Sequence, residues 1–288
     1  MIVAVASGKG GTGKTLVSAS LAAVWDRPLV AVDLDVEEPN LHLFLRPELD
    51  EVEEVALEVP VVDESRCTRC RACVDLCQYK AIALLGEHLL AFPEMCHGCG
   101  GCLGMCPEGA LSPGSRVLGT LEQGLCGPSR FLMGRLRVGE AMSPPLLRAV
   151  KARLSRMLEA APGDAVLDAP PGVSCPAMNA VMDSDVILLV AESTPFGFHD
   201  FRLAHQAFLP LGKPLGVVLN RAGLGDSSVP DYCAEHGLPV LAEIPYSRAV
   251  AEAYARGRVV AALSDEQAAL FTGLRNALRR LHAEAAHA

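Results

Sequence analysis

The chain has 288 residues, half of them hydrophobic, which is enough apolar material for a sizeable core in one or two domains. Its formal net charge of −9 argues against a dedicated nucleic-acid surface. No apolar run approaches the ~20 residues that span a bilayer, and we identify no secretion signal before the first strand-like run. We therefore expect a cytoplasmic protein that binds neither membrane nor nucleic acid, with eleven cysteines that are metal ligands rather than disulfides.

Short apolar runs alternate with helical patterns along most of the chain. Buried strands are predicted at 2–6, 29–33, 165–168, 186–191, 215–220 and 240–244, and helices at 14–25, 145–160, 175–182, 199–209, 230–236 and 248–256. Leu270, Leu274, Leu278 and Leu281 share one face of a last helix, which we expect to close the domain rather than to anchor a membrane. The alternation predicts an α/β fold with a doubly wound, mostly parallel sheet.

An internal repeat interrupts this alternation. The stretches "CTRCRACVDLCQYKAI" and "CHGCGGCLGMCPEGAL" carry four cysteines at identical spacing, each followed by a small apolar tail. Turn residues replace long periodic segments here. We expect a small α+β module at 64–113, inserted into a discontinuous domain formed by 1–63 and 114–288.

A glycine-rich loop, "GKGGTGKT", follows the first predicted strand and leads into a helical pattern. Gly8, Gly13, Lys14 and Thr15 satisfy the pattern G-x-x-x-x-G-K-[ST], in which backbone N–H groups cradle phosphates, the lysine bridges the terminal phosphates and the hydroxyl binds Mg²⁺. The alternative is an ordinary glycine-rich turn between strand and helix that binds no nucleotide. The expected nucleotide contacts of this loop are Gly8, Lys9, Gly10, Gly11, Thr12, Gly13, Lys14 and Thr15.

With Lys9 as a second lysine, the loop resembles that of the MinD/ParA/nitrogenase-iron-protein group of P-loop ATPases. The resemblance implies that Lys9 reaches the phosphates of a partner subunit, in a homodimer that forms on ATP binding. It also implies ATP hydrolysis that is slow without a partner, with Lys9, Lys14 and Asp35 as the catalytic residues.

Four further stretches resemble motifs of the same group. "VAVDLDVEEPN" places Asp33 and Asp35 at a strand end, where the second aspartate would orient water near Mg²⁺. "AVLDAPPG" would supply Asp168 to Mg²⁺ and the N–H of Gly172 to the γ-phosphate, so the implied Mg²⁺ ligands are Thr15, Asp35 and Asp168. Asn220 in "VVLNRAG" would contact adenine, and "EIPYSRAVAEAYARG" would close Pro245 and Tyr246 over the base. For each residue, an ordinary turn or strand-end role is the alternative.

The two cysteine runs have the spacing C-x₂-C-x₂-C-x₃-C, which is typical of bacterial ferredoxins whose fourth cysteine binds the other cluster. We expect one [4Fe–4S] cluster on Cys67, Cys70, Cys73 and Cys106, and a second on Cys96, Cys99, Cys102 and Cys77. Zinc is the alternative, although structural zinc sites usually use separated pairs. Gln78 stands where the ferredoxin run would carry proline. The whole chain resembles MinD-superfamily ATPases with an inserted ferredoxin domain.

Three cysteines lie outside these runs. Cys175 follows Asp168 by seven residues, the offset at which the nitrogenase iron protein binds a cluster shared across its dimer. That resemblance implies a third [4Fe–4S] cluster, on Cys126 and Cys175 of both subunits; two buried, unliganded thiols are the alternative. We expect Cys233 to be inert.

Three functions stay open from the sequence. The first is a nucleotide-switched homodimer that couples ATP to electron transfer through two [4Fe–4S] clusters towards a redox partner. The second is a metallocluster carrier that delivers clusters to an acceptor protein. The third is a MinD/ParA-like positioning ATPase whose clusters sense redox state.

Overall fold

The computed structural model describes residues 1–286, and its centre is a nine-stranded sheet within that range. Seven neighbouring strands are parallel, and two antiparallel strands complete one edge. In spatial order they are β11 (Val240–Pro245), β10 (Leu215–Ala222), β9 (Val186–Ala191), β1 (Ile2–Ala6), β8 (Asp164–Asp168), β2 (Leu29–Asp33), β7 (Ser129–Leu136), β6 (Leu111–Cys126) and β3 (Glu48–Val62).

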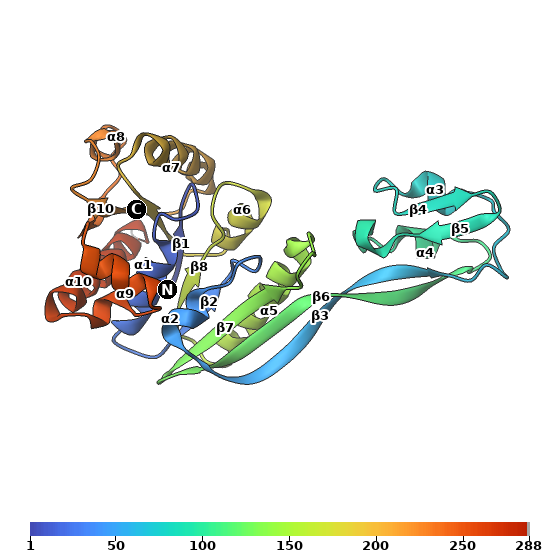
Figure 1. The fold of residues 1–288 in the computed structure, drawn as a ribbon, viewed down its shortest axis with the longest axis horizontal. Helices are drawn as coiled ribbons and strands as arrows, with labels where there is room; N and C mark the ends of the chain where they lie inside the picture. Colours follow the sequence, from blue (N-terminus) through green and yellow to red (C-terminus); the bar gives the residue numbers. More distant parts are fainter. Residues whose placement is uncertain (287–288) are drawn as a thin grey trace.

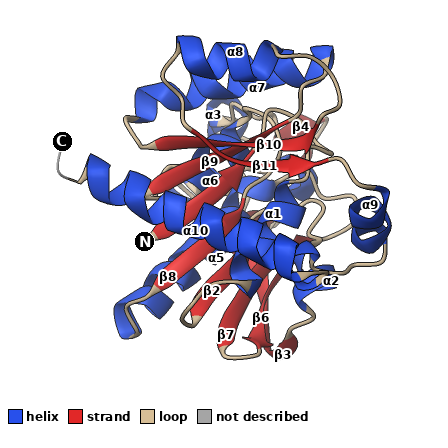
Figure 2. Cartoon of the chain, turned by 90° about the vertical axis from the view of Figure 1, so that its left-hand side faces the viewer, coloured by secondary structure: helices blue, strands red, loops and turns tan. Residues whose placement is uncertain are grey.

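Helices cover both faces of this sheet (Figure 2). One face packs against α1 (Lys14–Ala23), α2 (Leu41–Leu45), α9 (Arg248–Ala255) and α10 (Asp265–Ala285). The other packs against α5 (Ser143–Ala160), α6 (Cys175–Val181), α7 (Pro195–Phe208) and α8 (Ser228–Glu235). Successive β1 residues alternate between the two cores, as the pleat requires, with Val3 and Val5 in one and Ala4 and Ala6 in the other. The predicted doubly wound, mostly parallel sheet is confirmed.

All six predicted strands and the predicted helices are present, with small shifts at their ends. The largest shift is at α7, which begins at Pro195 rather than at residue 199. Thr194 caps this helix, because its Oγ1 accepts a hydrogen bond from the Gly197 N–H at 3.1 Å. The last helix closes the domain as expected, since Phe271, Leu274 and Leu278 are buried against the sheet. Between residues 1 and 286, no helix combines the length and apolar character that a membrane crossing needs.

β3 and β6 form a long two-stranded ribbon that was not predicted from the sequence (Figure 1). β6 contains three glycines and reads as turns in the sequence. Two of them are required by close backbone approach: a Cβ at Gly119 would lie 2.1 Å from the Arg135 carbonyl oxygen, and one at Gly124 would lie 2.2 Å from that of Glu48. The pairing shifts register at two points, between Leu49 and Glu51 and between Val55 and Ala56.

The ribbon carries a small lobe, residues 63–110, away from the body of the molecule (Figure 1). The lobe contains two one-turn helices and a hairpin: α3 (Ala72–Leu76), α4 (Gly101–Met105), β4 (Ile82–Leu85) and β5 (His88–Ala91). Short 3₁₀ turns lie at Pro93–Met95 in the lobe and at Leu209–Leu211 and Val260–Ala262 in the body. The buried core of the lobe is small, consisting of Cys73, Ile82, Leu89 and Leu111. A core of this size is too small to hold the lobe folded without a further constraint.

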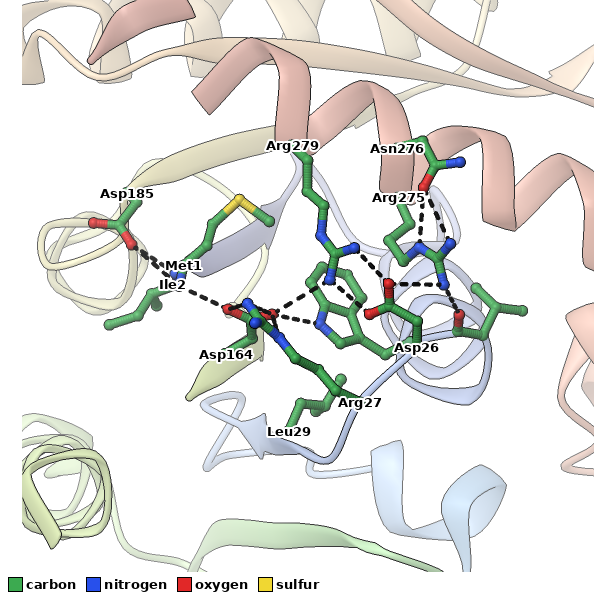
Figure 3. A network of polar contacts seen from close by, with 12 residues as sticks. Met1, Ile2, Asp26, Arg27, Leu29, Asp164, Asp185, Arg275, Asn276 and Arg279 are labelled. Atoms are coloured by element: carbon green, nitrogen blue, oxygen red, sulfur yellow. Dashed lines mark hydrogen bonds and ion pairs between the residues drawn. The ribbon is translucent and has the colours of Figure 1, made fainter. Parts of the chain in front are cut away.

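A buried carboxylate ties together the amino-terminal edge of the parallel strands (Figure 3). The Asp164 side chain is 1% exposed and accepts hydrogen bonds from the Met1 amino group, Trp25 Nε1 and the Arg27 guanidinium, at 2.8–2.9 Å. Arg279 on α10 lies 3.6 Å away. Burial raises the pKa of Asp164, but these hydrogen bonds outweigh burial and hold the pKa at about 2.

We expect Asp164→Asn to lower the free energy of unfolding by about 2 kcal/mol at pH 7, because the folded pKa lies nearly two units below the unfolded value of about 4. The contribution of this carboxylate is fully present above pH ~4 and is lost as the pH falls through the folded pKa. The difference between variant and wild type in urea unfolding should therefore shrink as the pH is lowered from 5. The exposed Asp50→Asn is the control, and a pH-independent difference would contradict the prediction.

Candidate nucleotide site and cysteine cavities

The glycine-rich loop joins β1 to α1 at the carboxyl edge of the parallel strands, where open α/β sheets bind ligands. Gly13 has φ +99°, and a Cβ there would lie 2.3 Å from Asn220 Nδ2, so only glycine fits. Lys14 and Thr15 form the buried first turn of α1. The loop therefore aims backbone N–H groups and the positive end of α1 at one point, which suits a phosphate.

The predicted Mg²⁺ ligands Thr15 and Asp168 lie in contact. Thr15 Oγ1 donates a hydrogen bond to Asp168 Oδ2 at 2.6 Å, and Ser18 Oγ donates to Oδ1 of the same carboxylate at 3.0 Å. Asp168 is buried, which raises its pKa, while Lys14 and the two hydroxyls oppose that rise. Burial also raises the pKa of Asp35 to about 6, an effect that Lys14 opposes and Asp168 reinforces. Oxygen ligands of this kind are those that Mg²⁺ prefers.

Asp33 shapes the segment that holds Asp35. It is fully buried, and its carboxylate accepts N–H hydrogen bonds from Asp35, Asn40 and Leu41 at 2.9–3.0 Å. Asp35 then faces a cavity of about 270 Å³ between the segments that follow β2 and β8. The residues that line this cavity are Asp35, Val36, Glu37, Glu38, Ser143, Pro170, Pro171, Ser174 and Pro176.

The predicted adenine contacts gather around a second cavity of about 250 Å³ beside the loop. Asn220, Pro245 and Tyr246 line it together with Gly11, Gly13 and Tyr254, among others. Asn220 Nδ2 also donates to the Thr12 carbonyl at 2.7 Å, so this side chain holds the phosphate loop in place. Tyr254 was not expected from the sequence.

Lys9 forms an ion pair with Glu192 of its own chain. Arg221 shares that carboxylate at 2.8 Å, and its Nη2 donates to the Gly11 carbonyl at 3.2 Å. Neither Glu192 nor Arg221 was predicted, although Glu192 follows a strand end of the kind that usually carries site residues. The N–H of Gly172 donates to the Ser7 carbonyl at 2.9 Å, so here it is engaged within the loop region rather than free for a γ-phosphate.

The eight cysteines of the repeat line two cavities in the lobe. The outer cavity contains Cys67, Cys70, Cys73 and Cys106, and all of its lining residues belong to the lobe. The inner cavity, of about 330 Å³, contains Cys77, Cys96, Cys99 and Cys102 and also touches Glu58, Val59 and Pro60 of the ribbon. In each cavity, three cysteines of one run meet the fourth of the other, which is the grouping that the ferredoxin spacing predicts.

Backbone N–H groups are directed at three of these sulfurs. Ala81 donates to Cys77 Sγ at 3.3 Å, Gly98 to Cys96 Sγ at 3.4 Å, and Ala110 to Cys106 Sγ at 3.2 Å. Such hydrogen bonds stabilise thiolates that bind a cluster. In the described part of the chain, no three His, Cys, Asp or Glu side chains converge closely enough to hold a single metal ion. A cube-shaped cluster holds its four cysteines further apart than a single ion does, so this spacing does not exclude an iron–sulfur cluster in either cavity.

The structure does not bring together Cys126 and Cys175, the two residues on which the resemblance implies a third cluster. Cys126 pairs with Ser129 at the tip of the β6–β7 hairpin, level with the start of β2. Cys175 begins α6, beyond the carboxyl end of β8. The length of the parallel strands separates the two ends of the sheet, so one subunit does not present both thiols at the same edge. Cys233 is buried, and burial raises its pKa to about 11, as suits an inert thiol.

A buried ion pair connects the inner cysteine cavity with the body. Arg116 on β6 donates through Nη2 to the Cys96 carbonyl at 3.5 Å, and its Nη1 pairs with Glu140 Oε2 at 3.2 Å. Both side chains are less than a tenth exposed. Glu140 Oε1 in turn accepts the N–H groups of Ala141 and Met142, directly before α5. The first residue of α5, Ser143, lines the cavity of Asp35.

The phosphate loop, the buried lysine and the two aspartates on a parallel sheet define a P-loop ATPase. Residues 3–260 match the family described as CobQ/CobB/MinD/ParA nucleotide binding domain, and the chain belongs to this family.

Two uncharacterized proteins of Methanocaldococcus jannaschii are similar over most of their length. MJ0579 is 29% identical over 89% of this chain and 90% of its own, and MJ0578 is 31% identical over 85% and 86%. Among solved structures, the septum site-determining protein MinD of Pyrococcus horikoshii, complexed with Mg-ADP, is 21% identical, with a TM-score of 0.59 and coverage of 99% of this chain and 98% of that one. Apo McdA from Cyanothece has a TM-score of 0.53 at 16% identity, covering 96% and 98%. These solved structures show the fold.

We expect Asn220→Ala to weaken MgATP binding about tenfold, because it removes the hydrogen bond to the Thr12 carbonyl together with the predicted contact to the base. Titration with a fluorescent ATP analogue measures the Kd. The matched control is Asn276→Ala, an exposed asparagine on α10. Equal affinities of the two variants would show that Asn220 does not contribute to the nucleotide site.

Proposed function

We propose that the protein is a nucleotide-switched homodimer that couples ATP binding and hydrolysis to one-electron transfer through two [4Fe–4S] clusters. The ATPase part follows from the family. The two cavities support the clusters, because each gathers four cysteines and the backbone donates to sulfurs in both. Iron–sulfur clusters bound there would supply one-electron redox chemistry. The thiolates of these cysteines would hold them, and the N–H groups would stabilise the sulfur charge.

The observation that carries the coupling is the contact series from Cys96 through Arg116 and Glu140 to α5. It joins one wall of the inner cysteine cavity to Ser143, which faces Asp35 across the 270 Å³ cavity. Asp35 and Pro170 belong to the two segments that follow β2 and β8, which would sense Mg²⁺ and the γ-phosphate. A buried ion pair has few alternative partners, so a shift of the segment before α5 displaces Arg116 and the carbonyl it holds.

This contact series gives a specific prediction. Arg116→Met together with Glu140→Gln removes both charges without leaving one unpaired and buried. We expect iron content and MgATP binding to stay near wild type, while any change that MgATP causes in the midpoint potential or EPR spectrum of the inner cluster falls by at least half. Anaerobic EPR titration with and without MgATP measures it, with Arg135→Met, an arginine paired at 3.1 Å to Glu122 of the ribbon, as control.

Lys14→Ala separates the parts of the proposal. It should keep the iron and lose every effect of ATP, because the phosphate loop and the cysteine cavities share no residue. If MgATP changes neither the midpoint potential nor the EPR spectrum of any cluster in the wild-type protein, the proposed coupling is wrong. If the protein binds no iron after anaerobic reconstitution, the proposed clusters are wrong.

The homodimer is supported by Lys9, whose counterpart in the resembling ATPases reaches across to a partner. In the single chain, Lys9 is held by the buried carboxylate of Glu192, and it must leave Glu192 to reach a second subunit. Releasing this lysine therefore competes with closure of the dimer.

We expect Glu192→Gln to strengthen ATP-dependent dimerisation by roughly tenfold, because a charge-assisted contact of about 1–3 kcal/mol no longer restrains Lys9. Analytical ultracentrifugation with a non-hydrolysable ATP analogue measures the dimer dissociation constant. The exposed Glu243→Gln should behave as wild type. Weaker dimerisation of Glu192→Gln would instead place Glu192 in the dimer contact.

A MinD/ParA-like positioning ATPase with redox-sensing clusters is the second candidate, and the solved relatives, which include MinD and McdA, favour it over electron transfer. Against a membrane role, α10 directs its apolar residues into the core rather than outwards. Co-sedimentation with anionic liposomes and with DNA, in the presence of MgATP, distinguishes the candidates. Binding to either surface would favour positioning, and cluster transfer to an apo-acceptor would favour a carrier.

A further inference from the structure

The two halves of the lobe share a backbone but differ in the residues at its strained positions. The repeat offset is 29 residues, and three pairs related by it have positive φ in both halves. The φ values are 60° at Arg69 and 66° at Gly98, 66° at Arg71 and 68° at Gly100, and 55° at Lys80 and 56° at Gly109. The second half uses glycine at all three positions, and the first half uses a basic residue at all three.

Glycine is the residue that this conformation favours, because any Cβ crowds the backbone at positive φ. The second half demonstrates that glycine serves the same turns. A basic residue at these positive-φ positions is therefore less favourable for the backbone than glycine would be. Strain of this kind is characteristic of functional positions.

Local contacts do not account for these residues. Arg69 donates to the Glu87 carbonyl at 2.9 Å, but its ion pair with the Glu87 carboxylate spans 3.7 Å between largely exposed groups. Arg71 lies 3.8 Å from the exposed Asp75. Ion pairs of this length in solvent contribute little to stability. Lys80 makes no ion pair within the described residues.

Arg69 and Arg71 flank Cys70, an exposed cysteine of the outer cavity. The inner cavity is lined partly by ribbon residues, and Arg116 connects it to the body. The outer cavity is lined only by residues of the lobe. At the inner cavity the equivalent positions are Gly98 and Gly100, which pack against Leu57 and Glu58 of the ribbon. Cys70 and its counterpart Cys99 are both exposed, but only Cys70 has an arginine on each side. Glu87 and Asp75 pair with these arginines only loosely, at 3.7 and 3.8 Å, so both guanidinium groups are available to a second protein.

We propose that Arg69 and Arg71, with the exposed edge of Cys70 between them, form the docking site for an acidic redox protein that donates single electrons to the outer cluster. The donor loses one electron and the cluster gains it, with no bond or proton transferred. Fixed positive charge beside the exposed ligand attracts and orients an anionic surface, although the chain as a whole is acidic. This inference rests on the proposed clusters but not on their coupling to ATP.

The test variant is Arg69→Gly/Arg71→Gly in the full-length, cluster-loaded protein. Because the second half folds with glycine at these positions, we expect unchanged iron content and an equal or slightly higher unfolding temperature. Arg69→Lys/Arg71→Lys keeps the charge. Arg258→Ala/Arg280→Ala removes the same two charges from exposed positions on the body.

Two measurements use a plant-type [2Fe–2S] ferredoxin as the acidic probe. With both proteins oxidised, calorimetry at low salt should give a Kd about tenfold weaker for the glycine variant than for the other proteins. In anaerobic stopped flow, reduction of the wild type by reduced ferredoxin should slow about tenfold between low and high salt, and the glycine variant should be slow and nearly salt-independent. Reduced methyl viologen, a cation, should reduce all the proteins at similar rates.

Equal binding and equal salt dependence in all variants would overturn the docking site. A glycine variant that binds ferredoxin normally but has a shifted cluster potential would also overturn it, because the arginines would then tune the cluster rather than dock a donor. If the wild type holds no iron, the proposed function fails; if it holds iron and every variant binds ferredoxin equally, only the docking site fails.

Discussion

The pairing of β3 with β6 is the constraint on which the rest of the molecule depends. The ribbon starts at the amino-terminal edge of the sheet, where Glu48 pairs with Leu125, and runs along β7 to the carboxyl edge. It leaves the body beside Leu136, whose N–H donates to the carbonyl of Val36, a residue of the Asp35 cavity, at 2.8 Å. Two antiparallel strands joined over 14 partner pairs are far stiffer than two separate linkers. The lobe is therefore held in one direction from the body (Figure 1), and the inner cavity contacts the body through Arg116.

The lobe depends on its cysteines more than the body does. Its four-residue core contrasts with the two extensive cores that sandwich the parallel sheet. Small domains of this kind need disulfides or metal to remain folded, and the cysteines of the lobe are free thiols directed at two cavities. Cluster binding and folding of the lobe would then be linked, whereas the nucleotide domain would fold without iron.

The sequence predicted what local pattern encodes and missed what tertiary pairing decides. The parallel strands, the phosphate loop and the grouping of the eight cysteines follow from short-range periodicity and spacing. The ribbon was missed because Gly119 and Gly124 look like turn residues until the neighbouring backbones are known. The Lys9–Glu192 pair joins residues far apart in the chain, and no motif spacing in the sequence predicts it. The separation of Cys126 from Cys175 could not be predicted for the same reason, since an offset from Asp168 does not say at which end of the sheet another cysteine lies.

The hydrogen bond from Thr15 to Asp168 has a consequence for how the site is filled. A hydroxyl and a carboxylate 2.6 Å apart already hold two oxygens in the neighbourhood that a divalent cation needs, and Ser18 fixes the other carboxylate oxygen. A divalent cation would not have to gather these groups from disorder: Thr15 would offer a hydroxyl lone pair and keep its proton, and Asp168 would offer a carboxylate oxygen. Little conformational entropy would then be lost when the cation binds, because its protein ligands would already be held in place.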